Sequence, residues 1–193
     1  DMNFGGILTA SSLIPEQDKQ MFLVNSIMEE AIASSQMEGA NTTRKVAKDM
    51  LRKQHQPRNK GQQMILNNYE TIRYISEHRN DEFNVANIKI IHASIAKNTL
   101  DDSSLEGVFR DNDDVVVQNS VTGTIVHRPP TFTQVEQMIE ELCAFANDES
   151  SEGFIHPIIK AIIIHFMLAY IHPFADGNGR TARLIMNYEL IKN

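Results

Sequence analysis

The sequence contains one cysteine, Cys143, no tryptophan and only 7% aromatic residues. A single cysteine excludes an internal disulfide and a cysteine-rich metal site. Because Cys143 lies on the apolar side of a helical repeat, we expect a buried thiol rather than a nucleophile. Long apolar runs are also missing, since the longest, residues 155–171, is interrupted by His156, Lys160 and His165. That run is too short and too polar for a membrane span, and we expect a helix buried on most sides.

Basic residues are outnumbered, with 18 Lys and Arg against 25 Asp and Glu and a net charge of −7 over 193 residues. Such a chain lacks the broad positive field of a nucleic-acid coat, so we expect no nucleic-acid partner. The 41% hydrophobic content is ordinary for a globular fold, and the length suits one domain, or one domain with an arm. Residues 1–6 lack a basic region followed by an apolar one, so we expect no signal peptide and a cytoplasmic protein. Since no membrane span is expected either, we expect no membrane partner. The chain starts without Met and stops within an expected helix, which leaves open that it is a fragment.

Apolar residues recur at three- and four-residue spacing along most of the chain, which predicts helices. The expected helices cover residues 18–36, a segment starting near Thr42 or Thr43, and residues 64–75, 84–95, 133–146, 155–171 and 180–193, with a polar loop over residues 54–63. Asn84 is the expected N-cap of the fourth helix. Two β-branched runs, residues 115–117 and 124–126, flank a turn and predict a β-hairpin. The predicted fold class is mainly α with one hairpin.

One segment, residues 172–183, combines several features of a phosphate site. It reads His-Pro-Phe-Ala-Asp-Gly-Asn-Gly-Arg-Thr-Ala-Arg. Gly177 and Gly179 allow close backbone approach and open a helix whose first N–H groups are unpaired, which makes an anion site. Arg180 and Arg183 share a face near the positive end of that helix.

The same segment also carries a base and a metal ligand. Asp176 is a hard oxygen ligand placed where a phosphate-bound Mg²⁺ would lie, and His172 can act as a base near neutral pH. Taken singly, His172 is more often structural, a Gly-x-Gly turn is weak evidence, and two arginines can be a solvated face. Their joint occurrence within twelve residues favours a phosphate-binding site with a base and a metal ligand.

The segment resembles the signature of the Fic family, His-x-Phe-x-Asp/Glu-Gly-Asn-Gly-Arg-x-x-Arg, with every defined position filled. Residues 107–110, the hairpin and residues 127–130 are similar to the family's target-docking flap, and residues 155–171 to the helix that leads into its active loop. The resemblance implies a Fic-like helical bundle with a β-hairpin flap. It implies a catalytic core over residues 61–193, with the flap at about residues 112–130 and the active-site loop at 172–183.

The activity implied by this resemblance is transfer of AMP from ATP to a Ser, Thr or Tyr hydroxyl of a target protein, with pyrophosphate leaving. By analogy, His172 takes the hydroxyl proton, Phe174 anchors the loop in the core, and Asp176 binds Mg²⁺ (or Mn²⁺) on the α- and β-phosphates. The remaining implied contacts are an anion hole made by Gly177, Asn178 and Gly179, and a clamp on the distal phosphates made by Arg180 and Arg183.

A second motif, Ser34 to Gly39, resembles the family's inhibitory helix, written Ser/Thr-x-x-x-Glu-Gly/Asn. Ser34 and Glu38 are four residues apart and so share a helix face. The resemblance implies that Glu38 pairs with Arg183, which removes the cation that orients the ATP γ-phosphate, and that Ser34 steadies the contact through Asn178. The motif lies in an expected N-terminal helical arm, residues 1–60, and so indicates the subgroup with an N-terminal inhibitor.

Rival interpretations remain open at this point. The same fold can remove AMP from modified targets or transfer another phosphate-containing group. A non-catalytic nucleotide-binding interaction module is a further alternative, against which the presence of both His172 and Asp176 argues. The sequence names neither the target nor the oligomeric state, a homodimer included. His92 and His165 are expected to be satisfied core histidines, whereas His127 is open between a loop-stabilising role and a substrate contact.

Overall fold

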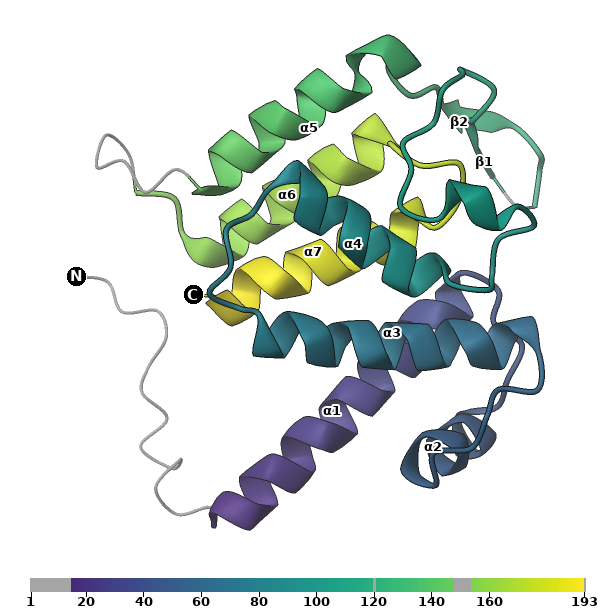
Figure 1. Ribbon diagram of the computed structural model, residues 1–193, viewed down its shortest axis with the longest axis vertical. Helices are drawn as coiled ribbons and strands as arrows, with labels where there is room; N and C mark the ends of the chain where they lie inside the picture. The colour runs from purple at the N-terminus through teal and green to yellow at the C-terminus, as the bar shows by residue number, and fades with distance from the viewer. Residues whose placement is uncertain (1–14, 120, 148–153, 193) are drawn as a thin grey trace.

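Helices dominate the computed structural model, which describes residues 15–119, 121–147 and 154–192 (Figure 1). Seven α-helices lie within these residues: α1 (Glu16–Met37), α2 (Arg44–Arg52), α3 (Lys60–Glu77), α4 (Val85–Ala96), α5 (Phe132–Asn147), α6 (Pro157–Ile171) and α7 (Asn178–Lys192). Between α4 and α5 lie a short 3-10 helix, η2 (Ser103–Leu105), and two strands, β1 (Val117–Gln118) and β2 (Ile125–His127). The mainly α prediction with one hairpin is confirmed. The first 14 residues of the expected N-terminal arm lie outside the described residues.

Side-chain caps set several helix starts. The Asn84 Oδ1 atom accepts from the Asn87 N–H at 2.9 Å, so the predicted cap of α4 is confirmed. Thr43 caps α2 through its hydroxyl, which settles the choice between two threonines. Asn59 Oδ1 accepts from the Gln62 N–H at 2.9 Å, so α3 starts at Lys60 and the predicted loop over residues 54–63 is too long. Polar residues in the first turn of α3 conceal that start, because an N-cap can initiate a helix before its apolar face begins.

The helices pack around two hydrophobic clusters. The larger one joins α3 to α7 around fully buried residues such as Ile88, Ile139, Ile164 and Ile185. The smaller one joins α1, α2 and α3, and Figure 1 shows α3 lying between α4 and α2. Because α3 contributes to both clusters, the expected boundary between an arm and a core at residues 60 and 61 stays a prediction.

Helix α6 departs from the prediction of a helix buried on most sides. Ile164 and Leu168 are fully buried, but Ile159 and Ile162 are each 54% exposed and Phe166 is 63% exposed. Within the described part of the chain, α5 and α7 are the helices that pack against α6 most extensively, and they leave this side uncovered. An almost uniformly apolar helix shows no period that tells a buried side from an open one. No helix of the described residues is both long and apolar enough to cross a membrane.

The hairpin is shorter than predicted. Strands β1 and β2 pair antiparallel, with Val117 opposite His127 and Gln118 opposite Ile125, and the register is irregular between Val117 and Gln118. Val115 and Val116 therefore lie outside the ladder. The His127 Nε2–H donates to the Tyr170 carbonyl at 2.8 Å, which ties the hairpin to the end of α6 and favours the loop-stabilising interpretation.

From the sequence, Cys143, His92 and His165 are each expected to be buried in the core. Cys143 is 7% exposed and His92 is fully buried with both ring nitrogens bonded, so these two expectations are confirmed. His165 is half-buried, and its Nδ1 atom is buried without a partner among the described residues. The expectation of a satisfied core histidine is therefore wrong for His165, because a ring on a long apolar helix has few polar atoms within reach.

Candidate functional site

The signature loop lies between two helices and closes on itself. Helix α6 ends at Ile171, His172 adopts the left-handed conformation with φ 51°, and α7 starts at Asn178. Phe174 is fully buried and anchors the loop in the core, as expected. The Asn178 side chain accepts from the Phe174 N–H at 2.9 Å and donates to the Phe174 carbonyl at 2.8 Å. Because the side-chain oxygen and nitrogen of Asn178 both bond to Phe174, only the backbone N–H of Asn178 is left to contact an anion.

The imidazole of His172 is held in a neutral form. Its Nδ1 atom lies 3.1 Å from the Ala169 carbonyl, which can only accept, so Nδ1 carries the proton and Nε2 keeps a free lone pair. Burial lowers the pKa of His172 below its usual 6.5, and the hydrogen bond to Ala169 opposes this shift only in part. The ring is therefore neutral at pH 7. A neutral imidazole with a defined tautomer suits a proton acceptor.

Arg110 fixes the backbone around His172, a role that the sequence analysis did not assign. It is 5% exposed, its Nε–H donates to the His172 carbonyl at 3.0 Å, and its backbone N–H donates to the Pro173 carbonyl at 2.9 Å. Its other guanidinium nitrogens donate to the Asp113 carboxylate and the Pro130 carbonyl. One buried side chain thus ties the signature loop to the segment that carries the hairpin. Its place in the flap-like stretch of residues 107–110 was the available signal.

The two arginines of the signature lie in different surroundings. Arg180 is 2% exposed, its Nη1 donates to the Ile95 carbonyl at 3.0 Å, and its buried Nε has no partner among the described residues. Burial lowers the pKa of Arg180 below its usual value, and the charge of Asp176 opposes that shift. The side chain of Arg183 is 16% exposed and points toward α1. Asp176 is exposed, and its Oδ1 accepts from the Gly177 N–H at 2.6 Å.

Arg183 is bonded to the end of α1. Its Nη2 lies 2.7 Å from Glu38 Oε1 and 3.1 Å from the Ser34 carbonyl, and its Nε donates to Ser34 Oγ at 2.7 Å. The structure thus brings together Ser34, Glu38 and Arg183, although α1 and α7 lie at opposite ends of the sequence. The expected Ser34–Asn178 contact is wrong, since Asn178 is occupied by Phe174 and Ser34 bonds to Arg183 directly.

The turn after α1 is shaped by polar contacts that the sequence analysis missed. Helix α1 ends at Met37, and Gly39 has φ +88°, which confirms it as the helix stop. Asn68 of α3 donates to Ser35 Oγ at 3.1 Å, and Gln36 donates to the Thr42 carbonyl at 2.8 Å. Asn68 was the available signal in the sequence, since an asparagine among the apolar positions of a helix needs a polar partner when it is buried.

The sequence of the chain is similar to those of known proteins. A profile of the Fic/DOC family matches residues 82–190, more than half of the chain. The chain belongs to the Fic/DOC family. It is 42% identical over 66 residues to the protein adenylyltransferase Fic of Nematostella vectensis, and 30% identical over 118 residues to protein adenylyltransferase fic-1 of Caenorhabditis elegans. These matches cover 34% and 56% of this chain, but only 15% and 23% of those relatives.

Solved structures share the Fic fold over almost the whole chain. A Fic-domain signalling protein from Bacteroides thetaiotaomicron gives a TM-score of 0.78 at 22% identity and covers 94% of this chain and 69% of that one. A Fic family protein from Desulfovibrio desulfuricans gives 0.73 at 20% identity, with 96% and 52% covered. At these identities the likeness shows the fold alone, and it confirms the Fic-like helical fold class.

In the Fic loop, the N-terminus of α7 already lies against an anionic side chain. A Cβ atom added at Gly179 would collide with the Glu38 Oε1 atom, so a carboxylate oxygen already lies against that glycine. The N-terminus of α7 therefore accommodates an anion at close range. Among the described residues, no group of three or more His, Cys, Asp or Glu side chains can hold a metal ion. A metal at the exposed Asp176 carboxylate thus depends on further oxygens, such as those of a nucleotide.

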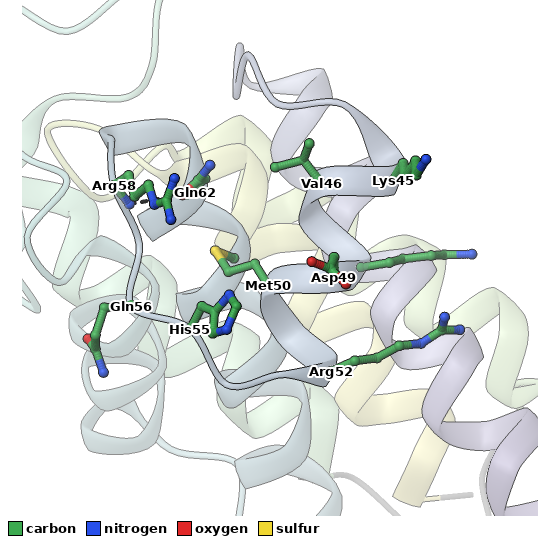
Figure 2. Close-up of a pocket in the computed structure, with 10 residues that line it drawn as sticks. Lys45, Val46, Asp49, Met50, Arg52, His55, Gln56, Arg58 and Gln62 are labelled. Atoms are coloured by element: carbon green, nitrogen blue, oxygen red, sulfur yellow. Dashed lines mark hydrogen bonds between the residues drawn. The ribbon is translucent and has the colours of Figure 1, made fainter.

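A cavity elsewhere in the chain lies apart from this loop. It measures about 650 Å³ and lies between α2 and the start of α3, where Figure 2 shows Met50 and His55 facing Arg58 and Gln62. No signature residue lines it. Two of its cations are bonded to α1, since Lys48 pairs with Glu29 and Arg52 donates to Asn25 at 3.0 Å. The candidate site is therefore the loop and not this cavity.

Proposed function

We propose that this Fic domain is a protein adenylyltransferase that transfers AMP from ATP to a hydroxyl of a target protein and is inhibited by its own Glu38. The observation that carries the proposal is the loop itself. A neutral His172 with a free Nε2, an exposed Asp176 carboxylate and the anion-accepting end of α7 follow one another along this short loop. The two curated relatives bear the name protein adenylyltransferase, which supports the same reaction class.

In the proposed reaction, His172 accepts the proton of the target hydroxyl at Nε2. The hydroxyl oxygen attacks the α-phosphorus of ATP, the bond to the β-phosphate oxygen breaks, and pyrophosphate leaves. The chain supplies no covalent nucleophile. It supplies position and charge, which are the main needs of transfer at phosphorus.

The other loop residues hold the nucleotide in this proposal. The backbone of Gly177, Asn178 and Gly179 faces the phosphates at the positive end of α7. Asp176 would hold Mg²⁺ or Mn²⁺, which would supply positive charge to neutralise the phosphates. Arg183, at the surface, clamps the distal phosphates. Arg180 is nearly enclosed and already donates to the Ile95 carbonyl, so it is a weaker candidate for binding the distal phosphates. Its Nε is the guanidinium atom that stays unpaired among the described residues.

Glu38 competes with ATP in this scheme. Its carboxylate bonds to Arg183 and lies against Gly179, so it occupies the place proposed for a distal phosphate. Two anions cannot share one cation at this distance without strong repulsion. Binding of a productive triphosphate therefore requires Glu38 to leave. This contact supports membership of the subgroup with an N-terminal inhibitor.

The target is proposed to dock on the hairpin. Strands β1 and β2 pair only with each other among the described residues, so their outer edges are available for backbone pairing with an extended segment. Recognition by strand addition depends mainly on backbone hydrogen bonds and discriminates weakly between sequences. The hairpin end is tied to α6 by His127 and to the loop by Arg110, so a segment docked on the hairpin would lie near the signature loop.

The decisive experiment uses Glu38→Gly protein with ATP labelled on the α- or on the γ-phosphate, Mg²⁺ and a cell lysate. Labelled protein bands from the α-label alone support AMP transfer. Bands from the γ-label alone show phosphotransfer. Release of AMP from a target modified beforehand shows the removal reaction, and no label from either ATP leaves a nucleotide-binding module. The His172→Ala/Glu38→Gly protein is the matched control for label that binds without catalysis.

A further inference from the structure

His92 of α4 contacts the signature loop from the core side. It is fully buried, and its Nε2 lies 2.9 Å from the Asp176 carbonyl. Its ring stacks on Phe174, with centroids 3.6 Å apart and planes 3° from parallel. Its Nδ1 accepts from the Gly107 N–H at 2.9 Å. One side chain thus contacts two residues of the loop and one residue of the segment that leads toward the hairpin.

The partners of His92 determine its protonation. A backbone N–H only donates and a carbonyl only accepts, so Nδ1 must be bare and Nε2 must carry the proton. Burial agrees with this neutral form, because it lowers the pKa of His92 to about 4. No other common side chain supplies a flat ring for stacking together with a donor and an acceptor on opposite edges.

The contact also sets the path of the loop backbone. Gly177 has φ +80°, and a Cβ atom added there would lie 3.3 Å from His92 Nε2. The loop therefore passes directly over the imidazole edge. The residue held by its carbonyl is Asp176, whose carboxylate is the proposed metal ligand, and the next residues form the proposed anion cradle.

We propose that His92 is a positioning residue for the transfer reaction: it locks the Asp176 carbonyl and the Phe174 ring to α4, and so sets the direction of the Asp176 carboxylate and of the cradle. This inference rests on the proposed function of the loop. His92 touches neither nucleotide nor target. It acts through Asp176, and the donor at Nε2 is the part of the ring on which positioning depends.

Three substitutions separate the parts of the imidazole. His92→Gln can present an amide N–H near the position of Nε2, whereas His92→Asn can present an acceptor near Nδ1 only. His92→Phe keeps a stacked ring without either polar atom. His165→Asn is the matched control, because it makes the same change at a histidine of α6 whose Nδ1 has no partner among the described residues.

Each variant is measured in the Glu38→Gly background for three quantities. These are the kcat and KM of AMP transfer, the thermal midpoint, and amide hydrogen exchange across residues 174–179. We expect His92→Asn and His92→Phe to lower kcat about ten- to a hundred-fold through misplacement of the loop. We expect both variants to speed exchange in the loop, while His92→Gln stays closer to the parent and His165→Asn matches it.

Two results overturn the inference. Loop exchange equal to that of the parent in both His92→Asn and His92→Phe shows that His92 does not hold the loop. Equal losses in all three variants, in proportion to the fall in thermal midpoint, show that His92 only fills the core. A Glu38→Gly protein that transfers no AMP refutes the proposed function instead, and the exchange measurement still decides the role of His92.

Discussion

Removal of the Glu38 carboxylate tests directly whether its contact with Arg183 is inhibitory, as proposed. The bond from Arg183 Nη2 to Glu38 Oε1 measures 2.7 Å, and the two side chains are 16% and 33% exposed. A hydrogen bond to a charged group contributes about 1.5–3 kcal/mol, and partial exposure of Glu38 argues against a larger value. Holding 99% of molecules in the inhibited state takes about 2.7 kcal/mol, half of a full two-state reversal. One such contact is therefore sufficient to silence the site.

Glu38→Gly should consequently raise the rate of auto-modification with α-labelled ATP about ten- to a hundred-fold, at about 1.4 kcal/mol per factor of ten. Apparent ATP affinity should rise by a similar factor, because the competing anion is gone. Glu38→Gln keeps the side-chain length and an acceptor but loses the charge, so it should release the site in part. Glu30→Gln, also on α1, removes a carboxylate that accepts from Asn187 at 3.5 Å rather than from Arg183, and should leave the rate unchanged.

Equal rates for the unchanged protein and Glu38→Gly would refute the inhibitory reasoning. A Glu38→Gly/Arg183→Ala protein is the second test, since Arg183 is both the partner of the inhibitor and the proposed phosphate clamp. We expect it to be much less active than Glu38→Gly alone. If the two were equally active, Arg183 would have no part in phosphate binding.

Three further outcomes are expected. His172→Ala in the Glu38→Gly background should abolish transfer and leave ATP binding nearly intact by calorimetry, and more than a tenth of the parent activity would contradict the assigned base; since the pKa of His172 lies below 6.5, the parent rate should fall only at lower pH. Transfer should require Mg²⁺ or Mn²⁺ and be lost in Asp176→Ala, so full activity in excess EDTA would exclude the metal. Burial raises the pKa of Cys143 from 9.0 to about 12, so the folded thiol should resist alkylation by iodoacetamide at pH 8. The free energy of unfolding should fall as the pH rises above 9, because the thiol ionises first in the unfolded chain. A Cys143→Ala protein should lack that part of the fall.

The elements that could be predicted are those with a local cause. The spacing of apolar residues gives the helices, and Asn84 gives the start of α4, because a cap acts within three residues. The exposed side of α6 and the length of the hairpin could not be predicted. Exposure at Ile159 and Ile162 depends on which helices cover α6, and strand length depends on whether an edge finds a partner.

The candidate site divides in the same way. The signature in residues 172–183 indicates which side chains the candidate site contains, but not which residues hold the loop in place. Arg110 and His92 come from the middle of the chain and bond to loop carbonyls, so no pattern in the loop indicates them. The side-chain partner of Ser34 could not be predicted from the sequence. The motif implied a contact with Asn178, whereas the hydroxyl accepts from Arg183 in the structure.

Arg180 and Arg183 look equivalent in the sequence, yet they differ in burial and in hydrogen-bond partners. Arg180 bonds to the Ile95 carbonyl, which also accepts from Asn67 of α3 at 3.1 Å, so it belongs to the buried frame that joins α3, α4 and α7. The hydrogen bonds of Arg183 in the described structure all go to the end of α1, to the hydroxyl and carbonyl of Ser34 and to the carboxylate of Glu38. A cation held by a separate helix can exchange one anion for another without disturbing the core. For that reason the proposed inhibition by α1 would be reversible through Arg183, whereas the same contact at Arg180 would require the core to open.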